Sequence, residues 1–236
     1  MQASRGITNL NGDSYRNSIY STGEGSLLIL RKEGKAANWQ VQPGINFNQK
    51  AVSDEVQTLP VMATQKRISG NHEVKVGDVH FVNQDYSTYS NFSYNADLLT
   101  ENDLSRYASY IALPTSTKSN YLQGATTATY QGKALKDNYD NNQIAQGDFR
   151  LEANFQTEKV QGAISNLGGR NYELAEGNIS VSDDGKLTFS GSSNYNGSQA
   201  YQGIFAGPNA EEVVGRVGYD ISFGGKREAT TQPSNQ

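Results

Sequence analysis

The chain has 236 residues, a formal net charge of −4 and no cysteine. The absence of cysteine excludes a disulfide framework, thiolate chemistry, an iron–sulfur cluster and a lipid-carrying cysteine within this sequence. Lysine and arginine are scattered along the chain, which argues against a nucleic-acid-binding surface. The length allows one large domain or two modest ones, and 24 glycines against 5 prolines indicate many short strands and turns rather than disorder.

The two ends of the sequence are polar. Met1 to Ser4 carry no basic and apolar signal region, so the protein is either cytosolic or a mature exported chain whose leader has been replaced by a start methionine. The composition, rich in tyrosine, asparagine, glycine and serine, favours export. The apolar run Leu27–Leu30 is far too short for a membrane helix. Residues 228–236 are expected to form a disordered tail.

Residues 1–120 are expected to be rich in short strands. An apolar strand is predicted at 26–30, and another begins at Trp39. Residues 70–82 are interpreted as two short strands around a turn at Gly77–Asp78.

Two further segments complete this region. An aromatic cluster follows the predicted hairpin and consists of Tyr86, Tyr89, Phe92 and Tyr94. Such side chains in a strand-rich domain usually belong to the core or to cross-strand pairs, and the alternative is that one or two of them form the wall of a site for a flat apolar cofactor. Residues 100–103 resemble a capping box, and apolar residues at helical spacing up to Ile111 predict one short helix. Residues 113–120 are interpreted as a linker.

The residue pattern of the sequence changes after Tyr121. Short alternating strands are predicted at 127–130, 147–155, 160–165, 178–181, 186–190, 200–205, 213–215 and 216–223. Their turns are rich in asparagine, aspartate and glycine. Regular short strands separated by such turns favour a small antiparallel up-and-down barrel, because a closed barrel leaves no free strand edge.

Residues 203–215 are predicted to form a strand, a forced turn and a second strand. Gly207–Pro208 breaks the apolar run, since proline has no N–H for a strand ladder. Residues 209–212 fit a single helical turn, and the carboxylates of Glu211 and Glu212 are interpreted as solvated turn groups. One face of the strand that follows is predicted from alternating apolar residues, namely Val217, Tyr219, Ile221 and Phe223.

The 203–215 unit resembles the last hairpin of the small β-barrel of a superfamily of Gram-negative surface proteins: transferrin-binding protein B, factor H binding protein and the secreted haem-binding hemophilins. Three upstream segments resemble other parts of that barrel, namely 124–134, 147–164 and 187–191. The resemblance covers residues 121–227. It implies a mainly β fold, with an N-terminal β-rich handle domain at 1–120 followed by a C-terminal eight-stranded antiparallel β-barrel at 121–227.

Few side chains in the sequence are candidates for catalysis or for binding a metal. It contains no Gly-x-Ser-x-Gly elbow, no His-Glu-x-x-His and no Walker loop, so we expect no enzyme. Its two histidines, His72 and His80, lie close together in the sequence, and imidazole is a common ligand of metals and haem iron. Spacing alone favours ordinary surface or hairpin histidines. A two-residue turn at Gly77–Asp78 would place them on opposite faces, and a three-residue loop would place them on the same face.

A short, cysteine-free chain with one handle and one barrel is most similar to the hemophilins. That resemblance implies a secreted haemophore that binds haem b non-covalently in the handle, with His72, His80 or both as axial ligands of the iron. It implies capture of haem from host haem proteins such as haemoglobin and delivery to a TonB-dependent outer-membrane receptor. It also implies passage through an outer-membrane export machinery, a location outside or on the surface of a Gram-negative cell, and a monomeric state.

A second hypothesis is a non-enzymatic surface or secreted module that binds a host protein, of the transferrin-binding or complement-regulator-binding type, without a prosthetic group. A third hypothesis, an adhesin-like structural barrel, is the least favoured. Colour distinguishes the first two, because a haem-bound preparation is red with a strong Soret band.

Overall fold

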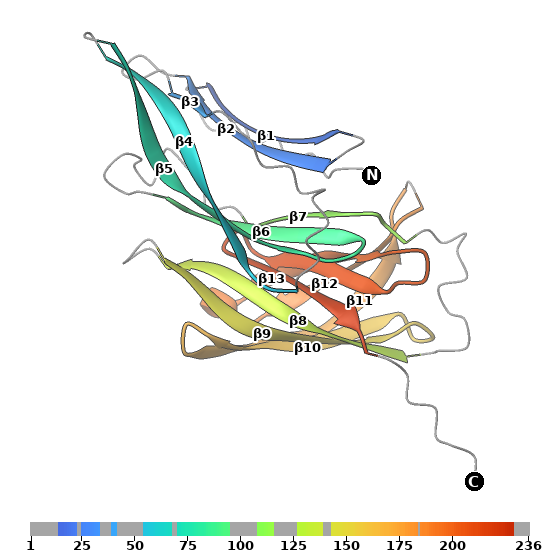
Figure 1. Cartoon of the computed structure of the whole chain (residues 1–236). Helices are drawn as coiled ribbons and strands as arrows, with labels where there is room; N and C mark the ends of the chain where they lie inside the picture. The colour runs from blue at the N-terminus through green and yellow to red at the C-terminus, as the bar shows by residue number, and fades with distance from the viewer. Residues whose placement is uncertain are drawn as a thin grey trace.

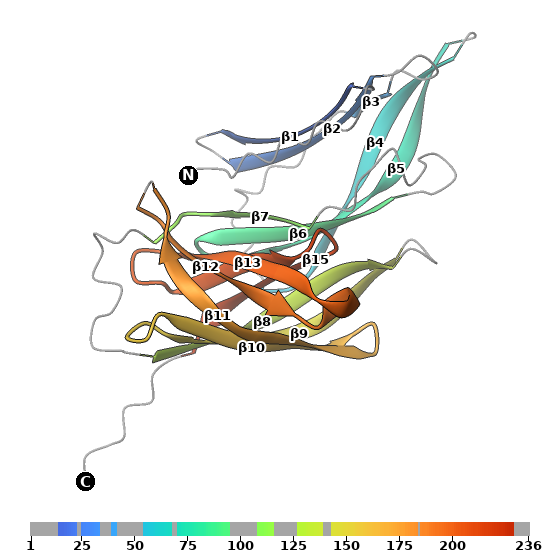
Figure 2. The same ribbon diagram turned by 180° about the vertical axis from the view of Figure 1, so that it is seen from behind.

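The computed structural model describes residues 14–22, 25–33, 39–41, 54–67, 70–94, 108–115, 127–138, 143–183 and 185–228. These residues form two antiparallel sheets that follow each other along the chain (Figures 1 and 2). The first is an open seven-stranded sheet, here called the handle sheet, and the second is a closed barrel of eight strands. The expected fold class, a β-rich N-terminal region followed by an eight-stranded antiparallel barrel, is confirmed.

The handle sheet keeps the order of the sequence, so each strand pairs with the next one along the chain. Its strands are β1 (Ser14–Thr22), β2 (Gly25–Glu33), β3 (Trp39–Val41), β4 (Gln57–Arg67), β5 (Gly70–Asn83), β6 (Ser87–Tyr94) and β7 (Ser109–Ala112). The β4–β5 hairpin is the longest part of the sheet and extends away from the barrel (Figure 1).

The barrel closes by pairing its last strand with its first. Its strands are β8 (Thr127–Asn138), β9 (Gln143–Asn154), β10 (Lys159–Leu167), β11 (Arg170–Val181), β12 (Leu187–Ser193), β13 (Gln199–Ala206), β14 (Glu212–Val217) and β15 (Ile221–Arg227). A short 3-10 turn, Tyr195–Gly197, joins β12 to β13. Closure runs through β15 and β8, whose register pairs Ile221 with Lys136 and Arg227 with Tyr130.

Alternating side chains fill the barrel interior, as expected for strands with one face toward a core. In β9 the inward residues are buried and the outward residues are exposed, which confirms the alternation predicted at 147–155. Phe149 stacks on Phe223 across the interior with ring centroids 4.5 Å apart. Gly203 leaves room for another ring, because a Cβ at this position would lie 2.2 Å from Cζ of Phe189.

Strands β14 and β15 are buried on both faces, because the handle sheet covers the outer side of this wall. Val213 and Val217 point into the barrel core, whereas Val214 belongs to a second apolar cluster that includes Val82 and Tyr89 of the handle. In both views β6 lies alongside the barrel (Figures 1 and 2). The handle and the barrel are therefore packed together over an apolar interface.

The hairpin predicted at 70–82 is wrong, because these residues form most of a single strand, β5. Gly77 pairs with Val61 of β4 on one side and with Tyr94 of β6 on the other. A β-bulge beside the Val61–Gly77 pair takes up one extra residue. Pairing on both sides outweighs the turn preference of the Gly-Asp pair.

The single strand predicted at 216–223 is also wrong. Strand β14 ends at Val217, and β15 begins at Ile221, which pairs with Val217 across a tight turn. Gly218 makes this turn possible, since its φ of +53° lies in the left-handed region that glycine adopts readily. Tyr219 therefore lies at the tip of the turn with 60% of its surface exposed, not on the face that it was predicted to share with Phe223.

Two smaller predictions need correction. Residues 209–212 do not form a helical turn, because Ala210 has a φ of +54° and Glu212 is the first residue of β14. Glu212 is buried, so its interpretation as a solvated turn carboxylate is wrong. The helix predicted up to Ile111 ends in a segment that is strand β7, and its earlier residues, 100–107, lie outside the described part of the chain. The predicted tail lies outside it from residue 229 onward.

Within the described residues, the structure has no helix that is both long enough and apolar enough to cross a membrane.

Candidate functional site

His80 is a buried residue at the centre of the handle sheet. It lies on β5, paired with Thr58 of β4 and Asn91 of β6, and only 8% of its surface is exposed. Its Nδ1 lies 2.9 Å from Oγ1 of Thr58, and its Nε2 lies 3.0 Å from Oγ of Ser93. Both ring nitrogens are thus hydrogen-bonded within the sheet. Ligation of iron requires a free lone pair on one of them, so His80 would have to give up one of these bonds.

The same face of the sheet is turned toward the barrel. Asn91 lies directly opposite His80 on β6, and cross-strand partners share a face. The side-chain amide of Asn91 donates to the carbonyls of Leu135 and Asp220 in the barrel, at 3.1 Å and 2.7 Å. His80 therefore lies at the boundary between handle and barrel, where it links three strands.

His72 lies in a different environment on the same strand. It pairs with Gln65 near the end of the β4–β5 hairpin that projects from the barrel (Figures 1 and 2). The structure describes its backbone position in β5 but not its side chain. At about 3.3 Å per residue, the Cα atoms of His72 and His80 lie roughly 26 Å apart along the strand. The structure does not bring the two histidines together, so one haem iron can take at most one of them.

The aromatic cluster after β5 does not form one wall. Tyr89 points to the barrel and is 1% exposed, and a Cβ added to Gly224 would lie 2.5 Å from its ring. Burial raises the pKa of the Tyr89 hydroxyl well above its usual range. Phe92, also buried, lies three residues along β6 and hence on its opposite face. The core interpretation of Tyr89 and Phe92 is confirmed, and the side chain of Tyr94 lies outside the described set.

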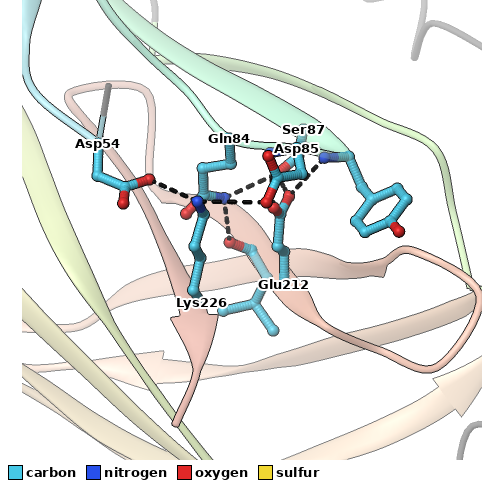
Figure 3. A network of polar contacts seen from close by, with 8 residues as sticks. Asp54, Gln84, Asp85, Ser87, Glu212 and Lys226 are labelled. Carbon is cyan, nitrogen blue, oxygen red and sulfur yellow. Dashed lines mark hydrogen bonds and ion pairs between the residues drawn. The ribbon is translucent and has the colours of Figure 1, made fainter. Parts of the chain in front are cut away.

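The main polar contact between handle and barrel was not predicted from the sequence (Figure 3). Glu212 of β14 is 1% exposed, and its carboxylate accepts three hydrogen bonds from the turn between β5 and β6. The donors are the backbone N–H groups of Asp85, at 2.7 Å, and Tyr86, at 3.0 Å, and the hydroxyl of Ser87, at 2.7 Å. Burial raises the pKa of Glu212, and the three hydrogen bonds oppose that rise. No periodic pattern separates this glutamate from the partly exposed Glu211 beside it.

Neighbouring side chains extend the same network, as Figure 3 shows. The amide of Gln84 donates to Oγ of Ser87 at 2.7 Å and, at 3.4 Å, to the carbonyl of Val213. Lys226 of β15 forms ion pairs with Asp54 at 2.9 Å and with Asp85 at 3.3 Å. The turn between β5 and β6 is thus fixed to β14 and β15 by both buried and surface contacts.

The segment after β7 is built into the barrel wall. The ladder between β12 and β13 ends at the pair Thr188–Ile204, and Thr115 lies in the gap beyond it. The N–H of Thr115 donates to the carbonyl of Phe205 at 2.8 Å, and its carbonyl accepts from the N–H of Leu187 at 3.0 Å. Its hydroxyl donates to the carbonyl of Gly207 at 2.7 Å, and the residue is fully buried. Residues 113–115 of the predicted linker are therefore bonded to the β12 and β13 wall, and residues 116–120 lie outside the described part of the chain.

One hollow of about 420 Å³ lies in the barrel where β8, β9 and β10 meet. Its lining includes the small buried residues Ala128 and Ala153 and the charged residues Glu152, Glu176 and Lys159. No histidine, tyrosine or methionine lines it. The hollow therefore offers no axial ligand for haem iron. In the part of the chain that the structure describes, no three histidine, aspartate or glutamate side chains are grouped to hold a metal ion.

Comparison of the sequence with known families gives one match. Residues 120–217 match the family described as Factor H binding protein, C-terminal, and this stretch runs from just before β8 to the end of β14. The match covers most of the barrel and fewer than half of the residues of the chain. A comparison with curated proteins found no match.

Solved structures that match the chain include proteins from three bacterial species. HpuA from Kingella denitrificans, solved in complex with human haemoglobin, is 13% identical, with a TM-score of 0.49 over 88% of this chain and 95% of its own. Transferrin-binding protein B from serogroup B Neisseria meningitidis is 16% identical, with a TM-score of 0.46 over 94% of this chain. A double mutant of transferrin-binding protein B from Haemophilus parasuis is 11% identical, with a TM-score of 0.41 over 93% of this chain and 67% of its own. This chain spans 54% of the Neisseria protein.

Proposed function

We propose that this protein is a non-enzymatic haem-binding protein, secreted by or displayed on a Gram-negative bacterium. In this proposal it takes haem b from a host haem protein such as haemoglobin and passes it to a TonB-dependent outer-membrane receptor. The match of residues 120–217 to the C-terminal family of factor H binding protein carries the binding part of the proposal, and the haem part is proposed from the resemblance to the hemophilins and from the histidines of the handle. A protein-binding family on the barrel, joined to a firmly docked handle, supports a binding function more than a catalytic one.

Within this proposal the two histidines have different roles. His80 is buried, faces the barrel and has both ring nitrogens hydrogen-bonded, so it does not fit an iron ligand without loss of sheet contacts. His72 lies on the part of β5 that projects from the barrel, and its imidazole is of the type that ligates haem iron. We therefore assign the axial ligand to His72 and a structural role to His80. Bound haem would supply the iron, and His72 would hold that iron as an axial ligand.

A second function is favoured by a specific observation: both ring nitrogens of His80 are occupied by hydrogen bonds. If His80 is structural, the chain keeps a single histidine for haem, and a protein-binding module without a prosthetic group becomes the competing proposal. Such a module would recognise a host protein of the transferrin or complement-regulator type through the handle or the barrel.

A haem titration separates the two proposals. Purified protein without haem is titrated with haemin, and absorption is recorded from 350 to 700 nm, a range that covers the Soret band (~400 nm). A haem-binding protein gives a saturable Soret band that shifts from that of free haemin, and it acquires the same band when mixed with haemoglobin and separated again. A protein that remains colourless under both conditions contradicts the haem proposal and leaves the protein-binding module.

A further inference from the structure

A continuous row of residues crosses the handle sheet at the level of His72. Its members are direct cross-strand partners on five neighbouring strands, from β1 to β5: Tyr15, Lys32, Trp39, Gln65 and His72. Directly paired residues lie on the same face of an antiparallel sheet. The backbone register therefore places all five positions on one face, here called the His72 face.

Apolar residues occupy the next positions of the His72 face on the side toward the barrel. Residues two apart in a strand share a face, and two positions from the row stand Leu30 on β2, Val41 on β3, Ala63 on β4 and Val74 on β5. Val41 pairs with Ala63, and Ala63 pairs with Val74, so these positions adjoin across the strands as well. An apolar row thus lies directly beside the row of His72.

The opposite face of the same strands is polar. The residues between the two rows pair with one another in the same way and are Arg16, Arg31, Gln40, Thr64 and Glu73. Three of these five are charged and none is apolar. This part of the sheet is therefore amphipathic, as expected for a sheet with one face toward an apolar partner and the other toward water. His72 is on its apolar face.

The charged positions described on the His72 face, from β1 to residue 74 of β5, are all positive. Lys32 is in the row itself, and Arg67, the last residue of β4, lies on the same face toward the tip of the hairpin. The acidic residues of the same stretch, Glu33 and Glu73, alternate onto the opposite face. The His72 face thus combines an apolar side toward the barrel with a cationic side toward the hairpin tip.

We propose that the His72 face recognises the porphyrin ring of haem itself, so that the protein binds the tetrapyrrole with or without iron. Haem is a flat apolar ring whose edge carries two carboxylates, and the face offers an apolar row beside two cations. In this assignment His72 ligates the iron, the row of Val41 contacts the ring, and Lys32 and Arg67 bind the carboxylates. The inference rests on the proposed function and adds the residues that recognise the ring.

Two porphyrins separate ring recognition from iron ligation. Haemin and iron-free protoporphyrin IX are titrated into the purified full chain, and absorption and tryptophan fluorescence are recorded. Trp39 is the single tryptophan of the chain, and at about 4.8 Å per strand its Cα atom lies about 10 Å from that of His72. A ring bound on the His72 face should therefore quench the emission of Trp39.

Matched variants at neighbouring residues show which face of the sheet holds the ring. Lys32→Glu is compared with Arg31→Glu, and Val41→Asp with Gln40→Asp, because the members of each pair alternate between the two faces. His72→Ala removes the ligand alone. Circular dichroism confirms that each variant is folded, and Lys32→Glu remains decisive if Val41→Asp is unstable.

We expect Lys32→Glu and Val41→Asp to weaken binding of both porphyrins by roughly tenfold or more, because one removes a charge-assisted hydrogen bond and the other places a carboxylate against an apolar ring. The two controls should stay within about twofold of the wild type, since they leave these contacts in place. His72→Ala should shift the Soret band of haemin and leave protoporphyrin binding unchanged.

Three results would overturn the assignment of the His72 face while leaving the proposed function intact. In the first, the wild type binds haemin, but Lys32→Glu and Val41→Asp bind it as well as their controls do. In the second, the wild type binds haemin but not protoporphyrin IX, and in the third, bound haemin does not quench Trp39. A wild type that binds neither porphyrin contradicts the proposed function, and this inference with it.

Discussion

Ser87 of the handle donates a 2.7 Å hydrogen bond to the carboxylate of Glu212, the first residue of barrel strand β14. Two backbone N–H groups of the same handle turn donate to this carboxylate as well. An ionised carboxylate only accepts hydrogen bonds, so the three donors and the oxygens of Glu212 satisfy one another. Because this contact is buried, handle and barrel are held in one relative position by a group that neither could satisfy alone.

Glu212→Gln should destabilise the protein. The amide NH₂ of glutamine would face hydrogen-bond donors and leave at least one of them without an acceptor, at a cost of about 1–3 kcal/mol in the free energy of unfolding. Urea denaturation followed by circular dichroism measures the loss. Glu176→Gln is the matched control, since this glutamate is exposed and its 3.6 Å ion pair should contribute at most about 1 kcal/mol. Equal stability of the two variants would show that Glu212 is not a structural contact.

The effect of Glu212→Gln should depend on pH. Burial raises the folded-state pKa of Glu212 above its ordinary value of 4.5, so the folded protein holds this proton more readily than the unfolded chain. The stability that this group contributes is therefore fully present below the unfolded pKa and is lost as pH rises through the folded pKa. The stability difference between wild type and Glu212→Gln should shrink as pH rises above 4.5. A difference that instead grows with pH would show that the three hydrogen bonds outweigh burial.

The barrel could be predicted because the patterns that indicate its strands and turns lie within short stretches of sequence. The alternation in β9 follows from the period of two in a strand, and the turns between strands carry asparagine, aspartate and glycine. The errors came where distant partners decide the structure. Gly77 has the sequence of a turn but is paired on both sides, and Val214 is buried by handle residues more than a hundred positions earlier. No local pattern contains those partners.

Residues 113–115 should add to the stability of the barrel. A fragment of residues 121–228 is still expected to fold, but it lacks the backbone bonds that Thr115 makes with Phe205 and Leu187. A fragment of residues 108–228 should unfold cooperatively at a higher temperature, because each lost buried hydrogen bond costs about 1 kcal/mol. Thermal unfolding of both fragments, followed by circular dichroism, makes the comparison. Identical midpoints would mean that residues 113–115 only lie against a barrel that is already complete.

For the candidate site, the sequence could predict the types of residue that can bind iron but not their surroundings. With no cysteine and Met62 as the single internal methionine, the main candidate iron ligands in the sequence are histidine and tyrosine, but spacing could not show that one histidine is buried. His80 is engaged because Thr58 and Ser93, which lie on other strands, reach its two nitrogens. Register across three strands is a tertiary property, so it could not be read from the positions 72 and 80.

His80→Ala should lower stability without removing haem. The substitution leaves the hydroxyls of Thr58 and Ser93 without their shared partner inside the sheet, at a cost of about 1–3 kcal/mol. Denaturant unfolding measures this loss, and haemin titration of the same sample measures the Soret band. His80→Gln is the conservative comparison, since its amide can bond both hydroxyls and should restore part of the stability. Loss of the Soret band in a well-folded His80→Ala protein would return the ligand role to His80.

His72→Ala should abolish or shift the Soret band while leaving stability nearly unchanged. Residue 72 lies on the projecting part of β5, about 26 Å along the strand from the contacts of His80, so its removal should not disturb the handle–barrel boundary. Ligation requires the neutral imidazole, so haem binding by the wild type should weaken as pH falls and protonates the ring. Haemin titrations of wild type, His72→Ala, His80→Ala and the double variant at several pH values measure both effects. A double variant with the wild-type Soret position and affinity would place the ligand on a tyrosine and overturn the assignment to His72.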